Sequence, residues 1–421
     1  MSRAVIHPAR LSGTLAAPPS KSAAHRALIC AALADGESRV SPLADSADMA
    51  ATIGVLRAMG AEIAPSENGG VTISSGRWNR EKMALLDCRE SGSTLRFLLP
   101  VACALGLTAT AAGRGRLPER PLGALMEQMK AHGVSFSGER MPFIVRGQLI
   151  PGRYELPGDV SSQFVTGLLF ALPLLDGESE IALTSPLQSA GYVEMTLRAL
   201  QESGIAVIPS ENGWRIPGNQ RYRAFDRAVE GDWSNAAFWL CAAAIGGDVR
   251  ITGLSNASAQ GDRAVCEILG RLGADITRDA RAVRCRAAKL RGCKIDAGQI
   301  PDLVPVLAVT AAFAEGDTEI HNAARLRIKE SDRLASTAAL LRSLGGSAEE
   351  FPDRLVVHGG GLRGGDAQGV NDHRIVMAAA VAALGCGEKV SVTDAHAVNK
   401  SYPDFFDDLK KLGGRCDVDM G

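Results

Sequence analysis

Small hydroxyl residues and cations gather just before several apolar segments of this chain. The first cluster, which opens SKSAAHRALICAAL, contains Ser20, Lys21, Ser22 and Arg26. A serine in this position predicts a helix N-cap, whose side-chain oxygen accepts hydrogen bonds from first-turn amides. Because a helix N-terminus also carries partial positive charge, the added cations make it a candidate anion site. For this cluster alone, plain capping beside a solvated lysine explains the residues equally well.

The second and third clusters add backbone access and hydrogen-bonding side chains. In SGSTLRF, Gly92 has no side chain to keep a ligand from the backbone. Arg120 precedes a proline at a predicted helix start, where an ordinary surface turn is the alternative interpretation. Ser161 alone would suffice as an N-cap, yet more polar groups follow it. These are Ser162, Gln163, Ser189 and Tyr192.

Charged side chains suited to proton transfer lie in the C-terminal part of the chain. Asp302 stands between a proline and an apolar segment, so we expect an N-cap that is also a candidate base. The segment KESDR places Lys329, Glu330 and Arg333 in a predicted first helical turn, where acids are ordinary but cations are less expected. A buried cation needs an anionic partner. Two further cations precede the last predicted helices: Arg374 in NDHR and Lys400 in NKSYPDFF.

The elements that position these residues form a repeat. Six predicted amphipathic helices, spaced about 70 residues apart, each end at a glycine that is followed by a short strand. A glycine just past a helix end supplies the left-handed conformation that stops the helix. The six glycines are Gly60, Gly133, Gly204, Gly273, Gly345 and Gly413.

A second helix of each repeat is apolar nearly all round, so other elements have to surround it. The predicted starts of these helices are Ser20, Ser91, Ser161, Ser234, Asp302 and Asp372. Short β-rich runs such as GGVTISSG and RLVVHG lie between the helices. We therefore expect an α/β fold with two domains of three repeats each, central buried helices and a seam near residues 225–232.

Composition excludes several classes of protein. The chain has 46 Lys plus Arg against 47 Asp plus Glu, which argues against a nucleic-acid-binding protein that relies on a global positive field. It has no phosphate-binding P-loop, H-E-x-x-H or G-x-S-x-G motif, and its seven histidines lack metal-ligand spacing. No apolar run reaches membrane-spanning length, and the opening MSRAVIHPARL lacks a signal core. With nine scattered cysteines that are expected to be reduced, a cytoplasmic protein is predicted.

Eight short motifs run in order along the whole chain. They are PPSKSAAHR, SGSTLR, RP at 120, GDVSSQF, IPD at 301, KESDR, NDHR and NKSYPDFF. Together with the sixfold repeat, they closely resemble the 5-enolpyruvylshikimate-3-phosphate synthase family. The resemblance implies two domains of three βαβαββ repeats each, the inside-out α/β barrel of enolpyruvyl transferases. The upper domain would cover residues 20–228, and the lower domain residues 1–19 plus 229–421. We expect these domains to close when a phosphorylated substrate neutralises their cationic faces.

The resemblance also implies an activity. The enolpyruvyl group of phosphoenolpyruvate would pass to the 5-hydroxyl of shikimate 3-phosphate, with release of phosphate through a tetrahedral ketal, in the shikimate pathway. Two phosphates and two carboxylates then share one site, which accounts for the number of cations. No metal, nucleotide or organic cofactor is implied, and we expect a monomer. Glyphosate, the family's inhibitor, would compete for the phosphoenolpyruvate site, and the sequence leaves sensitivity open.

Site residues follow from the same resemblance. Asp302 would be the base, and Glu330 the proton donor to carbon with Lys21 as alternative. Shikimate 3-phosphate would be held by Lys21, Ser22, Arg26, Ser161, Ser162, Gln163, Ser189, Asp302 and Lys329. Phosphoenolpyruvate would be held by Lys21, Gly92, Arg120, Gln163, Arg333, Arg374 and Lys400. Glu90 and Arg325 stand where many members have asparagine, so no role is assigned to them.

Two rival functions are considered. UDP-N-acetylglucosamine enolpyruvyl transferases share the fold and the donor, but usually carry a reactive cysteine in the loop before the RP motif. Here that loop reads TAAGRGRLPERP, and Lys21 is followed by serine rather than the rival's usual asparagine. A noncatalytic anion-binding protein of the same architecture would need the cations but neither Asp302 nor Glu330.

Overall fold

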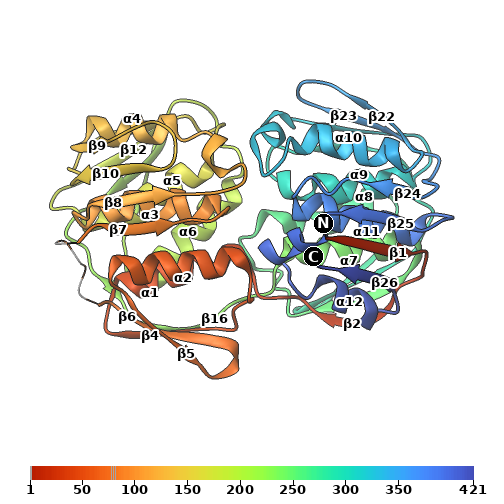
Figure 1. The fold of residues 1–421 in the computed structure, drawn as a ribbon, viewed down its shortest axis with the longest axis horizontal. Helices are drawn as coiled ribbons and strands as arrows, with labels where there is room; N and C mark the ends of the chain where they lie inside the picture. The colour runs from red at the N-terminus through yellow and green to blue at the C-terminus, as the bar shows by residue number, and fades with distance from the viewer. Residues whose placement is uncertain (1, 77, 79, 81) are drawn as a thin grey trace. The chain divides into compact units, whose positions relative to one another are not determined.

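The computed structural model describes residues 2–76, 78, 80 and 82–421. The chain divides into two compact units, one of Pro19–Val229 and one of Met1–Pro18 with Glu230–Gly421 (Figure 1). Each unit has its own hydrophobic core. The sites of the two units are therefore described separately below.

Each unit contains three helices that are buried on all sides. All nine residues of α9 are buried, and so are 12 of the 14 residues of α7. Such helices have no polar face, so they form the centre of their unit. In the first unit they are α1 (Lys21–Leu33), α3 (Gly92–Ala104) and α5 (Ser162–Ala171). In the second they are α7 (Trp233–Gly246), α9 (Val304–Ala312) and α11 (His373–Gly385).

Six further helices alternate with the central ones. They are α2 (Ala47–Met59), α4 (Gly123–Ala131), α6 (Ala190–Glu202), α8 (Val265–Arg271), α10 (Arg333–Ser343) and α12 (Phe405–Lys411). All six predicted glycines follow these helices with positive φ, between 79° at Gly204 and 123° at Gly60. The predicted helix ends are confirmed, because a left-handed residue stops each helix.

Six four-stranded sheets pack around these helices in the described part of the chain, and each has one parallel and two antiparallel pairings. In the unit Pro19–Val229 the strands, in spatial order, are β16 (Asp226–Ala228), β4 (Glu37–Ser41), β6 (Gly70–Ser74) and β5 (Glu62–Ser66); β7 (Ala84–Asp87), β8 (Ala109–Ala112), β10 (Phe143–Gly147) and β9 (Val134–Phe136); and β11 (Arg153–Leu156), β12 (Ser179–Leu183), β14 (Gly213–Ile216) and β13 (Ile208–Ser210). A short parallel pair, β3 (Ala34–Asp35) and β15 (Tyr222–Arg223), joins the two ends of this unit.

The other unit repeats the same strand order. Its sheets are β18 (Asp275–Arg278), β19 (Ala282–Arg286), β17 (Asp248–Thr252) and β2 (Ser12–Ala16); β20 (Lys294–Asp296), β21 (Asp317–His321), β23 (Leu355–His358) and β22 (Ser347–Glu350); and β24 (Gly365–Ala367), β25 (Val390–Thr393), β1 (Arg3–His7) and β26 (Arg415–Asp419). The predicted α/β fold of βαβαββ repeats is confirmed.

Three strands complete sheets that lie far from them in the sequence. β1 lies between β25 and β26, with Ala4 opposite both Val392 and Val418. β2 pairs in parallel with β17, and β16 pairs in parallel with β4. The N-terminal segment is therefore part of the same sheets as residues from the C-terminal half.

Four of the six predicted N-caps of the central helices are confirmed, and two are wrong. The side chains of Ser20, Ser91, Ser161 and Asp372 each accept a hydrogen bond from a first-turn amide. The fourth central helix is capped by Asp232 rather than Ser234, because the Asp232 carboxylate accepts from the amide of Asn235 at 2.8 Å. Asp302 caps nothing: it lies in the short 3₁₀ helix η5 (Pro301–Leu303), and its carboxylate binds arginine instead.

No helix in the described ranges combines the length and the apolar composition that a membrane crossing requires.

Candidate functional site

Lys21 is the first residue of α1 and is held by a carboxylate. Its Nζ lies 2.8 Å from Oδ2 of Asp48, a residue in the first turn of α2. The two side chains are 17% and 15% exposed, so the pair reaches solvent only in part. Ser20 caps the helix directly before it, through the amide of Ala23. The cation and the helix N-terminus thus occupy one position, which suits an anion.

Arg26 lies one turn further along α1 and is buried. Its guanidinium donates to the carbonyl of Ser22 at 2.7 Å, to the carbonyl of Tyr192 at 2.7 Å and to Oγ1 of Thr196 at 2.9 Å. Burial lowers the pKa of Arg26 to about 10, and Tyr192 opposes this shift. Arg26 therefore fastens α1 to α6 at the level of the predicted binding residues.

Two guanidinium groups converge on Gly92 at the start of α3. A Cβ atom at Gly92 would lie 2.5 Å from Nη1 of Arg96 and 2.7 Å from Nη1 of Arg120. Arg96 is buried and donates to the carbonyl of Pro121 at 2.9 Å. Like charges at such a short separation are unfavourable without a neutralising anion. The absence of a side chain at position 92 is what allows this arrangement.

Gln163 connects the cluster on α3 to the start of α5. Its Nε2 donates to Oγ of Ser93 at 3.0 Å, and its Oε1 accepts from Nη1 of Arg96 at 3.3 Å. Ser161 caps α5 through the amide of Gln163 at 3.3 Å, and Ser162 is buried beside it. Ser189, which precedes α6, is buried with a left-handed backbone, φ 56°. A strained conformation in a non-glycine residue is a feature often found at functional sites.

In the other unit, Arg333 is the centre of a cluster of acids. Its guanidinium lies 2.7 Å from Oδ1 of Asp302, 2.8 Å from Oε2 of Glu330 and 2.8 Å from Oδ2 of Asp372. The arginine side chain is only 2% exposed, and Asp372 is fully buried. Asp372 also accepts from the hydroxyl of Ser331 at 2.9 Å and caps α11. One buried arginine therefore holds both predicted catalytic carboxylates.

Asp302 is kept ionised by three cations. Burial by itself would raise the pKa of Asp302, but Arg333, Lys329 and Arg374 together bring it well below the ordinary range. Burial also lowers the pKa of Lys329 to about 8, although Asp302 acts in the opposite direction. The side chain of Asp302 is 23% exposed, so an ionised oxygen can meet a substrate.

Arg374 and Lys400 complete the cations of this unit. Arg374 is buried in α11, donates to the carbonyl of Ser234 at 3.1 Å and lies 3.7 Å from Oδ2 of Asp302. Lys400 ends the 3₁₀ helix η7 (Ala395–Lys400) and donates to the carbonyl of Asn371 at 2.6 Å. The predicted residues of each unit thus lie at the N-terminal ends of its central helices or directly beside them.

Some participating residues were not predicted. Arg96 was seen in the motif but given no role, although an arginine one turn into an apolar helix is the same signal that identified Arg374. Asp48 and Ser331 carry no signal of their own, because their partners are 27 and 41 residues away. Lys329 and Glu330 were expected inside a first helical turn, but α10 begins only at Arg333, with Asp332 as its cap.

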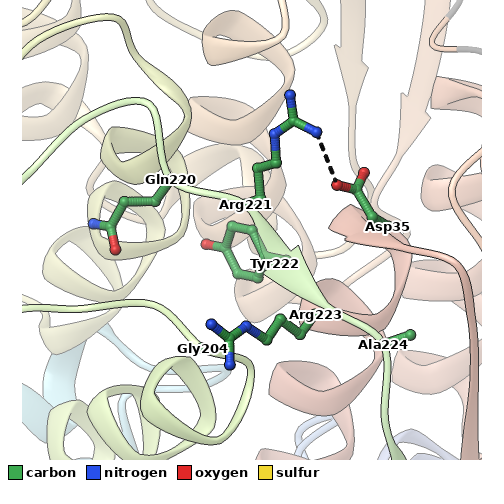
Figure 2. A pocket seen from close by; sticks show the side chains of 7 residues that line it. All are labelled: Asp35, Gly204, Gln220, Arg221, Tyr222, Arg223 and Ala224. Atoms are coloured by element: carbon green, nitrogen blue, oxygen red, sulfur yellow. Dashed lines mark ion pairs between the residues drawn. The ribbon is translucent and has the colours of Figure 1, made fainter.

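A hollow elsewhere on the first unit contains none of the predicted residues. It has a volume of about 520 Å³ and is lined by Asp35, Tyr222 and Arg223, among others (Figure 2). Arg221 and Asp35 form an exposed ion pair there at 3.7 Å. Asp35 follows the C-terminal end of α1, whose 13 residues separate it from Lys21 by about 20 Å. This hollow is therefore distinct from the candidate anion site.

Comparison with known proteins gives the same result over the whole chain. The family model for EPSP synthase (3-phosphoshikimate 1-carboxyvinyltransferase) matches residues 5–409. The chain is 42% identical to the 3-phosphoshikimate 1-carboxyvinyltransferase of Clostridioides difficile (strain 630), with 98% of each chain covered. It is also 42% identical to the enzyme of that name from Clostridium kluyveri, with 98% of this chain and 97% of the relative covered.

Solved structures show a similar fold. An EPSP synthase from Acinetobacter baumannii superposes with a TM-score of 0.85 at 26% identity, with all of both chains covered. The enolpyruvyl transferase NikO from Streptomyces tendae superposes with a TM-score of 0.83 at 21% identity, covering 99% of this chain and 98% of that one.

Proposed function

The chain belongs to the EPSP synthase family, and from this premise we propose that it transfers the enolpyruvyl group of phosphoenolpyruvate to shikimate 3-phosphate in the shikimate pathway. The oxygen of the 5-hydroxyl bonds to C2 of phosphoenolpyruvate while C3 gains a proton, which gives a tetrahedral ketal. Loss of a proton from C3 and of inorganic phosphate from C2 then restores the enol ether.

The observation that carries this proposal is the state of Asp302. An ionised, partly exposed carboxylate that lies among Arg333, Lys329 and Arg374 combines a base with the cations that would hold anionic substrates. A general base has to be deprotonated at the working pH and within reach of the proton that it removes. Asp302 meets the first condition, and its exposure makes the second attainable. Glu330 and Lys21 remain the alternatives for the proton donor to carbon.

We assign the binding residues of both units to the two substrates. Charge-assisted hydrogen bonds from several cations and amides offset the mutual repulsion of the phosphates and carboxylates. Shikimate 3-phosphate is held by Lys21, Ser22, Arg26, Ser161, Ser162, Gln163, Ser189, Asp302 and Lys329. Phosphoenolpyruvate is held by Lys21, Gly92, Arg120, Gln163, Arg333, Arg374 and Lys400.

Arg333 fits this assignment only if a carboxylate gives way. Its nitrogens already contact Asp302, Glu330 and Asp372. Asp372 is fully buried and also caps a helix, so it is the least able to move. Glu330, which is 24% exposed, is the partner that an incoming anion would displace.

Phosphate release from phosphoenolpyruvate, measured with each acceptor in turn, tests the activity. We expect release with shikimate 3-phosphate and none with UDP-N-acetylglucosamine. Release with only the nucleotide sugar would overturn the assignment. Asp302→Ala and Glu330→Ala variants should still bind shikimate 3-phosphate measurably but lose turnover. Unchanged turnover in both would instead favour a binding protein whose carboxylates do no chemistry.

We further propose that the enzyme acts as a monomer in the cytoplasm. One chain supplies every side chain assigned above. All nine cysteines are free thiols, which suits a reducing compartment. Light scattering of the purified protein would test the oligomeric state, and a dimer mass would contradict it.

A further inference from the structure

A buried carboxyl group beside the Asp302 cluster has no part in the roles assigned so far. Asp262 lies in the 3₁₀ helix η4 (Gly261–Ala264), and only 2% of the residue is exposed. The hydroxyl of Ser234, in the first turn of α7, donates a hydrogen bond to Oδ2 of Asp262. Oδ1 of Asp262 has no hydrogen-bond partner among the residues that the structure describes. Because an ionised carboxylate is costly in such surroundings, this acid needs an explanation.

Ser234 connects Asp262 to Arg374. While the hydroxyl of Ser234 binds Asp262, its backbone carbonyl accepts from Nη1 of Arg374 at 3.1 Å. Phe238, one helical turn further along α7, packs against the same guanidinium, 5.6 Å from ring centroid to Cζ. The other end of that guanidinium lies 3.7 Å from Oδ2 of Asp302. The side chain of Asp262 therefore anchors one side of an arginine that faces the catalytic carboxylate on its other side.

Acids from three elements face this point, and Arg374 of α11 is the cation among them. They are Asp232, which caps α7, Asp302 of η5 and Asp262 of η4. Burial raises the pKa of Asp262 to about 7, and repulsion from Asp302 adds to the effect, while Ser234 and Arg374 oppose it. Of the neighbouring acids, Asp302 gives up its proton to Arg333 and its other cations, and Asp262 keeps its proton until the pH reaches neutrality.

We propose that Asp262 is a positioning residue of the enolpyruvyl transfer, which holds Ser234 and, through Ser234, the guanidinium of Arg374 where it binds phosphoenolpyruvate beside Asp302. The inference rests on the proposed function and adds a residue that touches neither substrate. In its protonated form Asp262 adds no negative charge next to Arg374, so the arginine keeps its attraction for the anionic substrate. In its ionised form it would compete with phosphoenolpyruvate for that attraction.

Two substitutions of Asp262 separate shape from charge. Asp262→Ala removes the acceptor for Ser234, so we expect the KM for phosphoenolpyruvate to rise about tenfold, as one lost hydrogen bond near a charge would cause. The KM for shikimate 3-phosphate should stay within about twofold, because Arg374 is assigned to the other substrate. Asp262→Asn retains an acceptor oxygen and should restore most of the lost affinity near pH 6.5. An Asp262→Ala variant with unchanged KM for phosphoenolpyruvate would overturn the proposal.

The route through Ser234 is testable by a double-mutant cycle. Ser234→Ala removes the hydroxyl but leaves the carbonyl that binds Arg374. If Asp262 acts through Ser234, the double variant should have nearly the same KM for phosphoenolpyruvate as Asp262→Ala alone. Fully additive effects would show that Asp262 acts by another route, and would overturn this part of the proposal.

The pH profile gives a readout that a merely structural role would not change. In the wild-type enzyme the KM for phosphoenolpyruvate should rise as pH passes about 7, because Asp262 then becomes an anion beside Arg374. Asp262→Asn lacks this titration, so its profile, measured in the same buffers, should lack the same step. Identical profiles for the two proteins would contradict a role for the charge.

Asp408 provides a matched control. It is a buried aspartate of the same unit that accepts hydrogen bonds from Tyr402 at 2.5 Å and Lys411 at 2.8 Å, with no contact to the site residues in its recorded hydrogen bonds. Asp408→Asn should lower thermal stability and leave both KM values unchanged. A wild-type enzyme that fails to release phosphate would disprove the proposed function itself. An active wild type with insensitive Asp262 variants would disprove only this inference.

Discussion

Lys21 combines a structural contact with an exposed position at the start of a helix. Its ion pair with Asp48 is 2.8 Å long and partly exposed. In Lys21→Met, Asp48 would keep the favourable field of the first turn of α2, so the melting temperature should change by only a few degrees. Turnover should fall about 100-fold or more, since a cation that stabilises developing charge is lost. Steady-state kinetics and thermal denaturation measure the two effects.

Lys411→Met is the control for that experiment. Lys411 also pairs with an aspartate, Asp408, at 2.8 Å, but lies on α12 and is 66% exposed. Its removal should leave turnover intact. A wild-type rate in Lys21→Met would remove Lys21 from the site.

Gly92 is the only residue type that fits between Arg96 and Arg120. An alanine methyl group would lie under 3 Å from both guanidiniums and displace these flexible ends rather than the backbone. We expect Gly92→Ala to fold and to raise the KM for phosphoenolpyruvate about tenfold, with little effect on shikimate 3-phosphate. Gly54→Ala in α2, where a Cβ meets no atom within 4 Å, should instead gain about 1 kcal/mol of stability with unchanged kinetics. Equal kinetics for the two variants would contradict the assignment of Gly92.

Lys329 should make shikimate 3-phosphate binding sensitive to pH. Burial lowers its pKa to about 8, so the side chain is charged below that pH and neutral above it. The KM for shikimate 3-phosphate should therefore rise as pH increases through 8. In Lys329→Arg the side chain stays charged, so the rise should disappear. A wild-type KM that is flat from pH 7 to 9 would contradict this role.

At the scale of the element, the loop before α11 carries a strained residue. Val370 has φ 47°, and Asn371 follows with φ 52°. A β-branched residue in this region costs roughly 1–3 kcal/mol, and Val370 is exposed, so little packing offsets the cost. Val370→Asn should therefore raise the free energy of unfolding by about 1 kcal/mol. Val5→Asn in the extended strand β1 should lower it, and a loss of stability in both variants would show that the loop is not strained.

The elements themselves were largely predictable because their signals are local. A glycine after a helix and a serine before one act through hydrogen bonds within a few residues. Asp302 was misread as a cap because its partner Arg333 is 31 residues away and lies on another element. Asp262 gave no signal, since an acid in the polar turn SAQGDR is typical of a solvated first turn. Long-range ion pairs therefore account for most of what the pattern missed in the site.

At the scale of the molecule, the assigned residues come from both units. Like charges on the two units repel, and a bound phosphate neutralises them. Small-angle scattering should therefore record a smaller radius of gyration with shikimate 3-phosphate than without it, and an unchanged radius would count against closure. The same measurement on Lys21→Met and Lys329→Met should show a weaker response. Inorganic sulfate at equal ionic strength controls for general screening.

The placement of β1 between β25 and β26 also bears on how the protein is made. On a ribosome, the unit Pro19–Val229 can fold once its own residues have emerged. The first strands to leave the exit tunnel, β1 and β2, have to wait for partners that are translated later, β25 and β26 for β1 and β17 for β2. During that interval an apolar strand with unpaired edges is exposed, which makes nascent chains the form of this enzyme that depends most on chaperones.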